Sequence, residues 1–246
     1  MNVTKHFPVC DNRHQESEQL HNGYFRALYD VSLSIDKCEC VIIAGANGSG
    51  KSLLMSIIAG LEDPTSGTVE INAKVGLVFQ EADAQILGET PREDIALGPK
   101  NMKLKKEEII FRVNAALKDS GLESRADFPA HSLSGGEKRR LAAAGVLAMD
   151  ADIIIFDEPY ANLDYPGIVQ VNNLFIKLKN EGKTVIILTH ELEKCMALCS
   201  RFIVLCNGKK VFDGSLVQAL ECEPEKWGIR HPLRKTACKL EDLLWA

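Results

Sequence analysis

Residues 45–52 read Gly-Ala-Asn-Gly-Ser-Gly-Lys-Ser, and no other stretch constrains the fold of this 246-residue chain as strongly. A glycine, four residues and then Gly-Lys-Ser is the spacing of a phosphate-binding loop. The apolar run 40–44 before it predicts a buried strand, and the helical spacing of residues 52–59 predicts a helix that ends at Gly60. This order of strand, loop and helix is the context that such a loop requires, so we expect a nucleotide-binding α/β fold.

The glycines of this loop have a direct chemical purpose. They allow successive backbone N–H groups to turn toward the β- and γ-phosphates of a nucleotide, and the helix that follows adds the positive end of its dipole. We expect Lys51 to reach the phosphates and the hydroxyl of Ser52 to ligate Mg²⁺. The residues predicted to bind the phosphates are Gly45, Asn47, Gly48, Ser49, Gly50, Lys51 and Ser52.

Two carboxylates follow a second run, residues 152–156, which is apolar after Asp152. A fully apolar strand that ends in acids is typical of a buried parallel strand, whose carboxyl end lies at the ligand-binding edge of the sheet. A nucleotide-bound Mg²⁺ would keep Asp157 ionised, and Glu158 would then accept a proton from an attacking water. The alternative is a pair of strand-end acids that face solvent. The phosphate-binding loop upstream favours the first interpretation.

His190 follows a third apolar run, residues 184–188. A single histidine is usually structural or merely exposed. This one ends a predicted core strand on the same sheet edge as Lys51 and Asp157, so we favour a contact with the γ-phosphate.

A further helix start stands at residues 133–137, which read Leu-Ser-Gly-Gly-Glu. Ser134 and Glu137 have the spacing of a capping box. Two glycines in a first helical turn cost about 1 kcal/mol each relative to alanine, so a purely structural helix start rarely uses them. They do allow close approach of the backbone to an anion. We therefore expect a second phosphate contact here, made by Ser134 and Gly136.

Composition narrows the class of protein. The 46% hydrophobic content suits one large globular α/β domain, with or without an inserted lobe, and a net charge of -5 does not favour nucleic acid as the main partner. No apolar run approaches the roughly 20 residues that span a bilayer, and residues 1–24 lack the apolar core of a signal peptide, so we expect a cytosolic protein. The eight cysteines form no C-x-x-C pair, so we interpret them as reduced, mostly buried residues with no metal or disulfide role.

The remaining pattern predicts the other elements. We expect strands at 2–8, 27–35, 68–71 and 74–79, a loop-like segment at 81–100, helices at 105–118 and 166–180, a hairpin at 202–212 and a helical segment after Gly214. Residues 10–21 are interpreted as a polar surface loop. The segment 221–246 contains Trp227, Leu240, Leu243, Leu244 and Trp245, and its apolar side chains fit either a dimer contact or packing on their own domain.

The order and spacing of these motifs resemble the ABC transporter ATPases across nearly the whole chain. The Leu-Ser-Gly-Gly-Glu signature is close to diagnostic of that superfamily. The resemblance implies an α/β P-loop NTPase with a mainly parallel central sheet and an antiparallel β subdomain. Residues 1–220 would form the ATPase domain, with a helical subdomain inserted at about 82–150, and 221–246 a C-terminal helical extension.

The resemblance also implies how such a site works. Two ATPase subunits close head to tail, with ATP between the P-loop of one and the signature helix of the other, so Ser134 and Gly136 would serve the partner's nucleotide. Gln80 resembles the residue that senses Mg²⁺ and the water and links to the membrane subunit. Asp164 resembles the residue that communicates across the dimer, Glu158 would be the general base, and His190 would hold the γ-phosphate.

Finer matches at 75–80, 83–86, 93–99 and 135–140 resemble the energy-coupling factor importers. This branch implies a transmembrane coupling subunit and a substrate-binding membrane subunit as partners, uptake of a vitamin or a cobalt or nickel ion, and a place at the cytoplasmic face of the membrane. The rival interpretations are a soluble ABC-type ATPase of translation or DNA repair and a regulatory nucleotide binder. Paired ATPase domains, long coiled coils and basic extensions are missing from the chain, which disfavours the soluble ATPase. The intact Asp157-Glu158 pair disfavours the regulatory binder.

Some positions depart from the family pattern. Phe7-Pro8 resembles the Tyr-Pro that stacks on adenine, so Phe7 is the candidate for that contact and Tyr24 the alternative. Cys38 stands where a turn glycine is usual, Leu53 where threonine follows the loop, and Tyr160 where threonine follows Asp-Glu-Pro. Tyr160 would narrow the site or alter the dimer contact, and the sequence favours neither.

Overall fold

The computed structural model describes residues 2–8, 20–21 and 23–233. Their central sheet has the strand order β5-β6-β7-β4-β8-β9, with all neighbours parallel except the hairpin of β8 and β9. Its strands are β4 (Cys40–Ala44), β5 (Val75–Val78), β6 (Ile153–Asp157), β7 (Thr184–Leu188), β8 (Arg201–Cys206) and β9 (Lys209–Ser215). The mainly parallel α/β fold expected from the sequence is confirmed.

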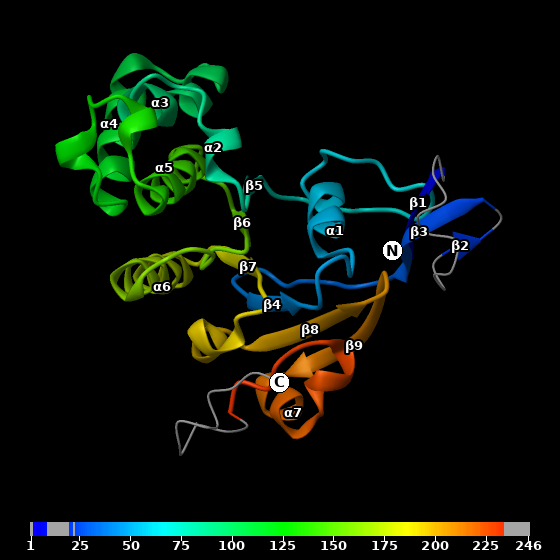
Figure 1. Ribbon diagram of the computed structural model, residues 1–246. Helices are drawn as coiled ribbons and strands as arrows, with labels where there is room; N and C mark the ends of the chain where they lie inside the picture. Colours follow the sequence, from blue (N-terminus) through cyan, green and yellow to red (C-terminus); the bar gives the residue numbers. More distant parts are fainter. Residues whose placement is uncertain (1, 9–19, 22, 234–246) are drawn as a thin grey trace.

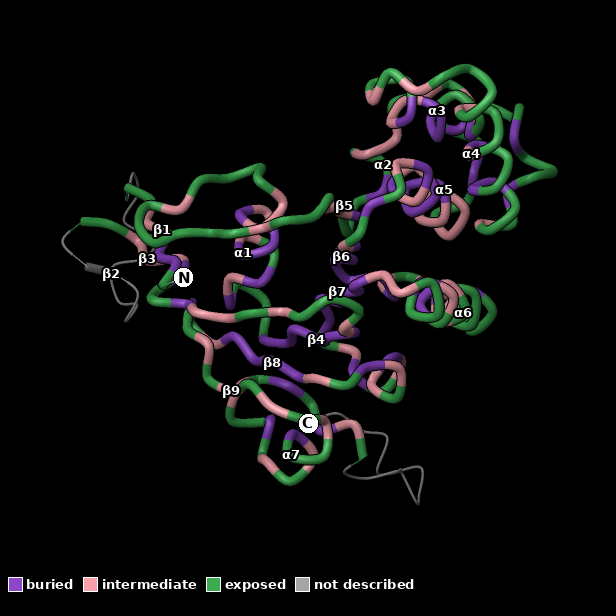
Figure 2. Tube along the Cα trace, turned by 180° about the vertical axis from the view of Figure 1, so that it is seen from behind, coloured by how far each residue is buried: buried purple, intermediate pink, exposed green. Residues whose placement is uncertain are grey.

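Helices cover both faces of this sheet, which explains why β4 and β7 are buried along their whole length. Ile43 and its neighbours on one face pack against α1 (Lys51–Ile58). Ile42 and its neighbours on the other face pack against α6 (Tyr165–Asn180). Figure 2 shows the buried residues concentrated along β4, β6, β7 and β8.

A small antiparallel sheet stands beside α1, at the opposite end of the molecule from the helical lobe (Figure 1). Its order is β1-β3-β2, from β1 (Val3–Pro8), β2 (Leu20–His21) and β3 (Tyr24–Val31). The strand predicted at 2–8 is confirmed, whereas the one predicted at 27–35 begins earlier and ends at Val31. The strand predicted at 68–71 is wrong, because the structure forms no strand there, and the neighbouring segment meets β1 through an isolated bridge between Thr4 and Ser66.

Four helices form a lobe around their own apolar cluster. They are α2 (Ala82–Gln85), α3 (Pro91–Asn101), α4 (Lys106–Asp119) and α5 (Gly135–Ala148), with 3-10 turns at Glu123–Arg125 and Ala130–Ser132. The expectation of a loop over 81–100 is therefore wrong for α3. Its prolines suggested a loop, but Pro91 occupies the first turn, where a helix tolerates proline, and Thr90 caps that turn by accepting from the N–H of Glu93. Ile95 then anchors the helix in the lobe core.

The C-terminal part packs on its own domain as far as the structure describes it. Helix α7 (Leu216–Glu221) and a 3-10 turn at Pro224–Trp227 follow β9, and two further 3-10 turns (Leu192–Lys194 and Met196–Leu198) precede β8. The Trp227 ring lies 5.7 Å from that of Phe212 and packs against the sheet cluster, so it is no free dimer contact. Leu240, Leu243, Leu244 and Trp245 lie outside the described residues, as does most of the predicted loop at 10–21.

Six cysteines fall within the described residues, and all are free. Cys40, Cys195 and Cys199 are buried in the sheet cluster, with the Cys40 and Cys199 sulfurs 3.2 Å apart. No group of three or more His, Cys, Asp or Glu side chains in the described part of the chain is arranged to hold a metal ion. The prediction that cysteines are buried is confirmed for these three.

Candidate functional site

The glycine-rich loop is held between two strands and its own helix. Helix α1 begins at Lys51 behind Gly50, which has a φ of 99°. A Cβ on Gly45 would lie 2.2 Å from the carbonyl oxygen of Leu205 in β8, and one on Gly50 would lie 2.7 Å from the Leu28 side chain in β3. Glycine is thus required at both positions by close packing as well as by conformation.

Lys51 is the buried cation of this loop. Its side chain is only 6% exposed, and Nζ donates to the carbonyl oxygens of Gly45 at 2.7 Å and Ala46 at 3.1 Å. Burial lowers the pKa of Lys51, while the nearby charges of Glu158 and Asp157 raise it. The buried hydroxyl of Ser49 has no hydrogen-bond partner among the described residues. The loop therefore carries a cation, an unused hydroxyl and a helix N-terminus, the groups that bind phosphate.

Asp157 ends β6 beside the loop, 9% exposed. The pKa of Asp157 is raised, mainly by burial. A hydrogen bond with Ser52 lowers this pKa, the negative charge of Glu158 raises it further, and the positive charge of Lys51 lowers it. Its Oδ1 atom is buried without a partner in the described part of the chain. A buried carboxylate oxygen with no partner, next to a serine hydroxyl, is a donor set that suits Mg²⁺.

Glu158 is held at the end of the sheet by its backbone and by His190. Its φ of 46° places it in the left-handed region, and its N–H donates to the carbonyl of Leu188 at 2.9 Å. The Nδ1 atom of His190 lies 2.9 Å from Oε1 of Glu158, while Oε2 is buried without a partner among the described groups. His190 is 53% exposed and Glu158 only 8%, so the histidine reaches the carboxylate from the solvent side.

The remaining predicted residues lie on other segments. Gln80 is exposed and follows β5 by two residues, because the strand ends at Val78 and not at Gln80. Ser134 caps α5 in a capping box with Glu137, as expected, and the hydrogen bond from the Ser134 N–H is the main cause that lowers the pKa of Glu137. Gly136 lies one residue into α5. The fold thus brings Lys51, Ser52, Asp157, Glu158 and His190 together, and leaves Ser134 and Gly136 on the separate helical lobe (Figure 1).

The two candidates for adenine stacking are neighbours on the small sheet. Phe7 pairs with Phe25 and Pro8 with Tyr24, so both candidates sit at one end of the β1–β3 ladder. Phe7 is 38% exposed and Tyr24 50% exposed, so both side chains reach the surface. Both residues therefore stay candidates for adenine contact.

Tyr160 neither narrows the site nor reaches the surface. Its side chain is fully buried, and its hydroxyl donates to Oδ1 of Asn172 at 2.6 Å. The amide of Asn172 donates in turn to the carbonyl of Lys194 at 2.8 Å. Tyr160 thus joins the segment after Glu158 to α6 and to the turn that follows His190, and both sequence-based explanations are wrong. Asp164 has a local structural role as well, because it caps α6 by accepting from the N–H of Gly167 at 3.0 Å.

Sequence reasoning passed over Arg139. This side chain, on α5, donates Nη1 to the carbonyl of Ala161 and Nη2 to the carbonyl of Gln80 at 3.2 Å. The available signal was its position three residues after Gly136, which places both residues on one face of α5.

Because Asp157 carries a buried charge, we expect the folded chain to become more stable when that charge is removed by substitution. Because the pKa of Asp157 is raised above the 3.8 of an unperturbed aspartate, the folded state binds a proton more readily than the unfolded state. Stability therefore falls as pH rises from about 4 through the folded-state pKa. We expect Asp157→Asn to unfold at a higher temperature than the wild type at pH 7.5, with a difference that shrinks toward pH 4.

Thermal unfolding without nucleotide, followed by circular dichroism, measures this effect. The exposed Glu70→Gln is the matched control that also removes one negative charge. A lower unfolding temperature for Asp157→Asn than for wild type at pH 7.5 would contradict the prediction.

Comparison with known proteins places this site in a family. A family model described as ABC transporter matches residues 28–161, which include the loop, the signature and both carboxylates. The chain belongs to the ABC transporter ATPase family. The energy-coupling factor transporter ATP-binding protein EcfA of Carboxydothermus hydrogenoformans is 41% identical over 202 residues, which cover 77% of this chain and 75% of that protein.

A second relative and two solved structures agree with this assignment. EcfA2 of Methanospirillum hungatei is 36% identical over 87% of this chain, which spans 57% of that protein's length. The structure of cbiO1 from Clostridium perfringens, part of the ABC transporter complex cbiONQ, aligns with a TM-score of 0.74 at 33% identity, over 82% of this chain and 87% of that one. A dimeric ATP-binding cassette in a post-hydrolysis state with ADP and Pi aligns with a TM-score of 0.75 at 31% identity, over 87% and 97%. This ABC ATPase therefore has the fold of cassettes that bind nucleotide as dimers.

Proposed function

We propose that this chain is the ATP-hydrolysing subunit of an energy-coupling factor importer. The observation that carries the proposal is the meeting of Lys51, Asp157, Glu158 and His190 at one sheet edge, with a separate signature helix on the lobe. The first group can bind and cleave a nucleotide, and the second can complete the site of another subunit. The likeness to several energy-coupling factor ATP-binding proteins supports the importer branch.

The groups around the loop fit a nucleotide triphosphate bound through its phosphates. The predicted phosphate-binding residues from Gly45 to Ser52 surround the N-terminus of α1, and Lys51 supplies a positive charge. Phe7 or Tyr24 would stack on the adenine ring. Binding would draw the Lys51 ammonium from backbone carbonyls to phosphate oxygens, a stronger charge-assisted interaction.

The chain also fits the metal that such a reaction uses. Ser52 and Asp157, with Gln80 as a further ligand, would hold Mg²⁺, and the unpartnered Oδ1 of Asp157 is the observation that favours this role. When bound, the ion neutralises charge on the transferred phosphoryl group.

Glu158 and His190 would divide the remaining chemistry. Glu158 accepts a proton from the attacking water through its unpartnered Oε2, while His190 holds Oε1 and contacts the γ-phosphate. Gln80 positions the water and reports the state of the site to the membrane partner. Catalysis is mainly positioning and charge stabilisation, as is general in phosphoryl transfer.

A second ATPase subunit completes the site in this proposal. Ser134 and Gly136 of one subunit would contact the γ-phosphate held by Lys51 of the other, whether the second subunit is another copy of this chain or a related one. An added Cβ on the neighbouring Gly135 would meet no atom within 4 Å, so the first turn of the signature helix is open to a ligand. Each dimer would then carry two ATP sites.

The transported substrate would pass through other subunits. No helix within the described ranges is long and apolar enough to cross a membrane. We propose a transmembrane coupling subunit and a substrate-binding membrane subunit as partners, a place at the cytoplasmic face of the membrane, and a vitamin or a transition-metal ion as the substrate. Nucleic acid is not among the proposed partners.

Affinity capture tests this proposal. Tagged chain is recovered from gently solubilised membranes of its own source, and the associated proteins are identified by mass spectrometry. Recovery of a transmembrane coupling subunit and a small substrate-binding membrane protein is expected. Recovery of soluble partners alone, with ATP hydrolysis intact, would favour the soluble ABC-type ATPase instead.

A further inference from the structure

Arg139 connects three segments that the proposed mechanism uses for different purposes. It lies on α5, which begins with the signature residues Ser134 and Gly136. Its guanidinium donates to the carbonyl of Gln80 and to the carbonyl of Ala161, in the turn that leads from Glu158 to Asp164. One side chain thus joins the signature helix to the backbone that follows β5 and to the backbone that follows β6.

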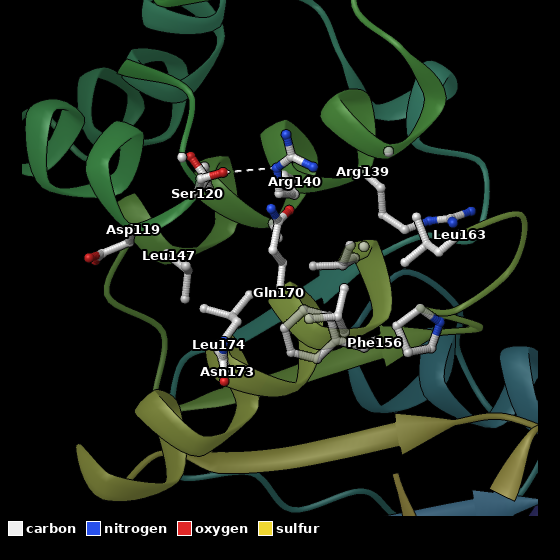
Figure 3. Close-up of a pocket in the computed structure, with 18 of the residues that line it drawn as sticks. Asp119, Ser120, Arg139, Arg140, Leu147, Phe156, Leu163, Gln170, Asn173 and Leu174 are labelled. Atoms are coloured by element: carbon white, nitrogen blue, oxygen red, sulfur yellow. Dashed lines mark hydrogen bonds between the residues drawn. The ribbon is translucent and has the colours of Figure 1, made fainter. Parts of the chain in front are cut away.

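The surroundings of Arg139 give this connection a defined geometry. Arg139 is half-buried in the wall of a cavity of about 330 Å³ between the helical lobe and the core, and Figure 3 shows its side chain reaching toward Leu163. A Cβ added to Gly136 would find the Leu163 side chain as its nearest atom, at 3.6 Å. The turn at 161–164 therefore meets the signature helix through a hydrogen bond at Ala161 and through the close approach of the Leu163 side chain to Gly136.

The chemistry of arginine suits this position. Its planar fork presents separate N–H groups to two acceptors, which a lysine ammonium cannot do with the same geometry. The neighbouring Arg140 makes a different contact, because its Nε donates to the carbonyl of Ser120 at the end of α4, within the lobe (Figure 3). The two adjacent arginines on α5 thus donate to different segments of the chain.

We propose that Arg139 is a positioning residue that couples the two ATP sites of the dimer. The inference rests on the proposed function, in which Gln80 and Glu158 serve the nucleotide of the same subunit and the signature helix serves that of the other; the 161–164 turn follows Glu158 along the chain. A shift of Gln80 or of the turn on nucleotide binding is carried through the guanidinium to the signature helix. Binding at one site then sets the geometry of the other, which is the condition for coupling between sites.

Steady-state phosphate release against ATP concentration tests the coupling, with Arg139→Met as the main variant. We expect a fall in kcat of about 10- to 100-fold, since small misplacements of a catalytic group cost this much. The Hill coefficient should fall from above 1 to about 1, because the sites no longer communicate. Affinity of the unassembled chain for a fluorescent ATP analogue should stay within about twofold of wild type, since Arg139 does not touch the P-loop.

Two further variants make the result decisive. Arg140→Met removes the same charge one residue along and should keep the cooperativity. Arg139→Lys keeps a cation that can reach one carbonyl, so its kcat should lie between those of Arg139→Met and the wild type. If circular dichroism shows that Arg139→Met does not fold, the reduced kcat of Arg139→Lys relative to wild type provides the test instead. Full cooperativity in Arg139→Met, or equal loss in Arg140→Met, would overturn the inference while leaving the proposed function intact. A wild-type chain that releases no phosphate would overturn both.

Discussion

Replacing Glu158 by glutamine is expected to leave ATP binding intact and to reduce turnover by at least about 100-fold, the lower range for loss of a general base. Glutamine keeps the shape of the side chain and can still pair with His190, which lies 2.9 Å from Oε1 in the native chain. It cannot take a proton from water at Oε2. Steady-state phosphate release at saturating ATP gives the turnover, and a fluorescent nucleotide analogue gives the affinity.

Glu193→Gln is the matched control for this result. Glu193 is an exposed carboxylate on the short turn that follows His190. Its replacement by glutamine removes the same charge outside the proposed site. The control should hydrolyse ATP at the wild-type rate. Near-normal turnover in Glu158→Gln would remove Glu158 from the role of general base.

Lys51→Met is expected to weaken nucleotide binding by about 10- to 100-fold, the loss expected when charge-assisted hydrogen bonds to phosphate are removed. The native side chain is buried and held by two loop carbonyls, so it stands at the loop before the nucleotide arrives. Methionine has nearly the same length and suits the buried environment. The folded loop should therefore survive while its affinity for phosphate falls.

Titration with a fluorescent ATP analogue measures the affinity of Lys51→Met, and Lys37→Met serves as the control. Lys37 is exposed in the turn before β4, outside the site. An unchanged dissociation constant for Lys51→Met would show that this lysine does not contact the phosphates. Loss of helical circular dichroism in the variant would show that Lys51 holds the loop instead.

The meeting of the candidate site residues at one sheet edge could be predicted from the sequence because its signals are local. The spacing within 45–52 predicts a phosphate-binding loop, and apolar strands before Asp157 and His190 place both residues at the same edge of a parallel sheet. The helix cap at Ser134 is likewise encoded within four residues. The loop, the strand ends and the helix cap are each determined by residues within one helix, strand or loop, or by the sheet edge at which parallel strands end together.

The errors of sequence reasoning arose where distant contacts decide. Helix α3 forms despite two prolines and a glycine, because Ile95 packs in the lobe and Gly98 lies against Met149, which no local pattern reveals. The segment at 68–71 alternates like a strand, but the structure forms no strand there. Tertiary packing overrides local propensity in both cases.

Long-range contacts also hid the roles of two side chains. Tyr160 looked like a residue of the site surface, yet its hydroxyl is satisfied by Asn172 inside the fold. The sequence presents Arg139 only as one residue of the 135–140 match, yet its guanidinium meets two carbonyls that lie 59 and 22 residues away along the chain. Such roles depend on chain segments that only the folded structure brings together.

We propose that this one chain carries both halves of a shared ATP site, the loop with Lys51 and the signature end with Ser134 and Gly136. Analytical ultracentrifugation of Glu158→Gln, with and without MgATP, examines this arrangement, because slow hydrolysis preserves the closed state. We expect a monomer without nucleotide and a dimer that holds two ATP molecules with it. A monomer that is saturated with ATP, under conditions in which the wild type hydrolyses ATP, would show that one chain does not form the shared site.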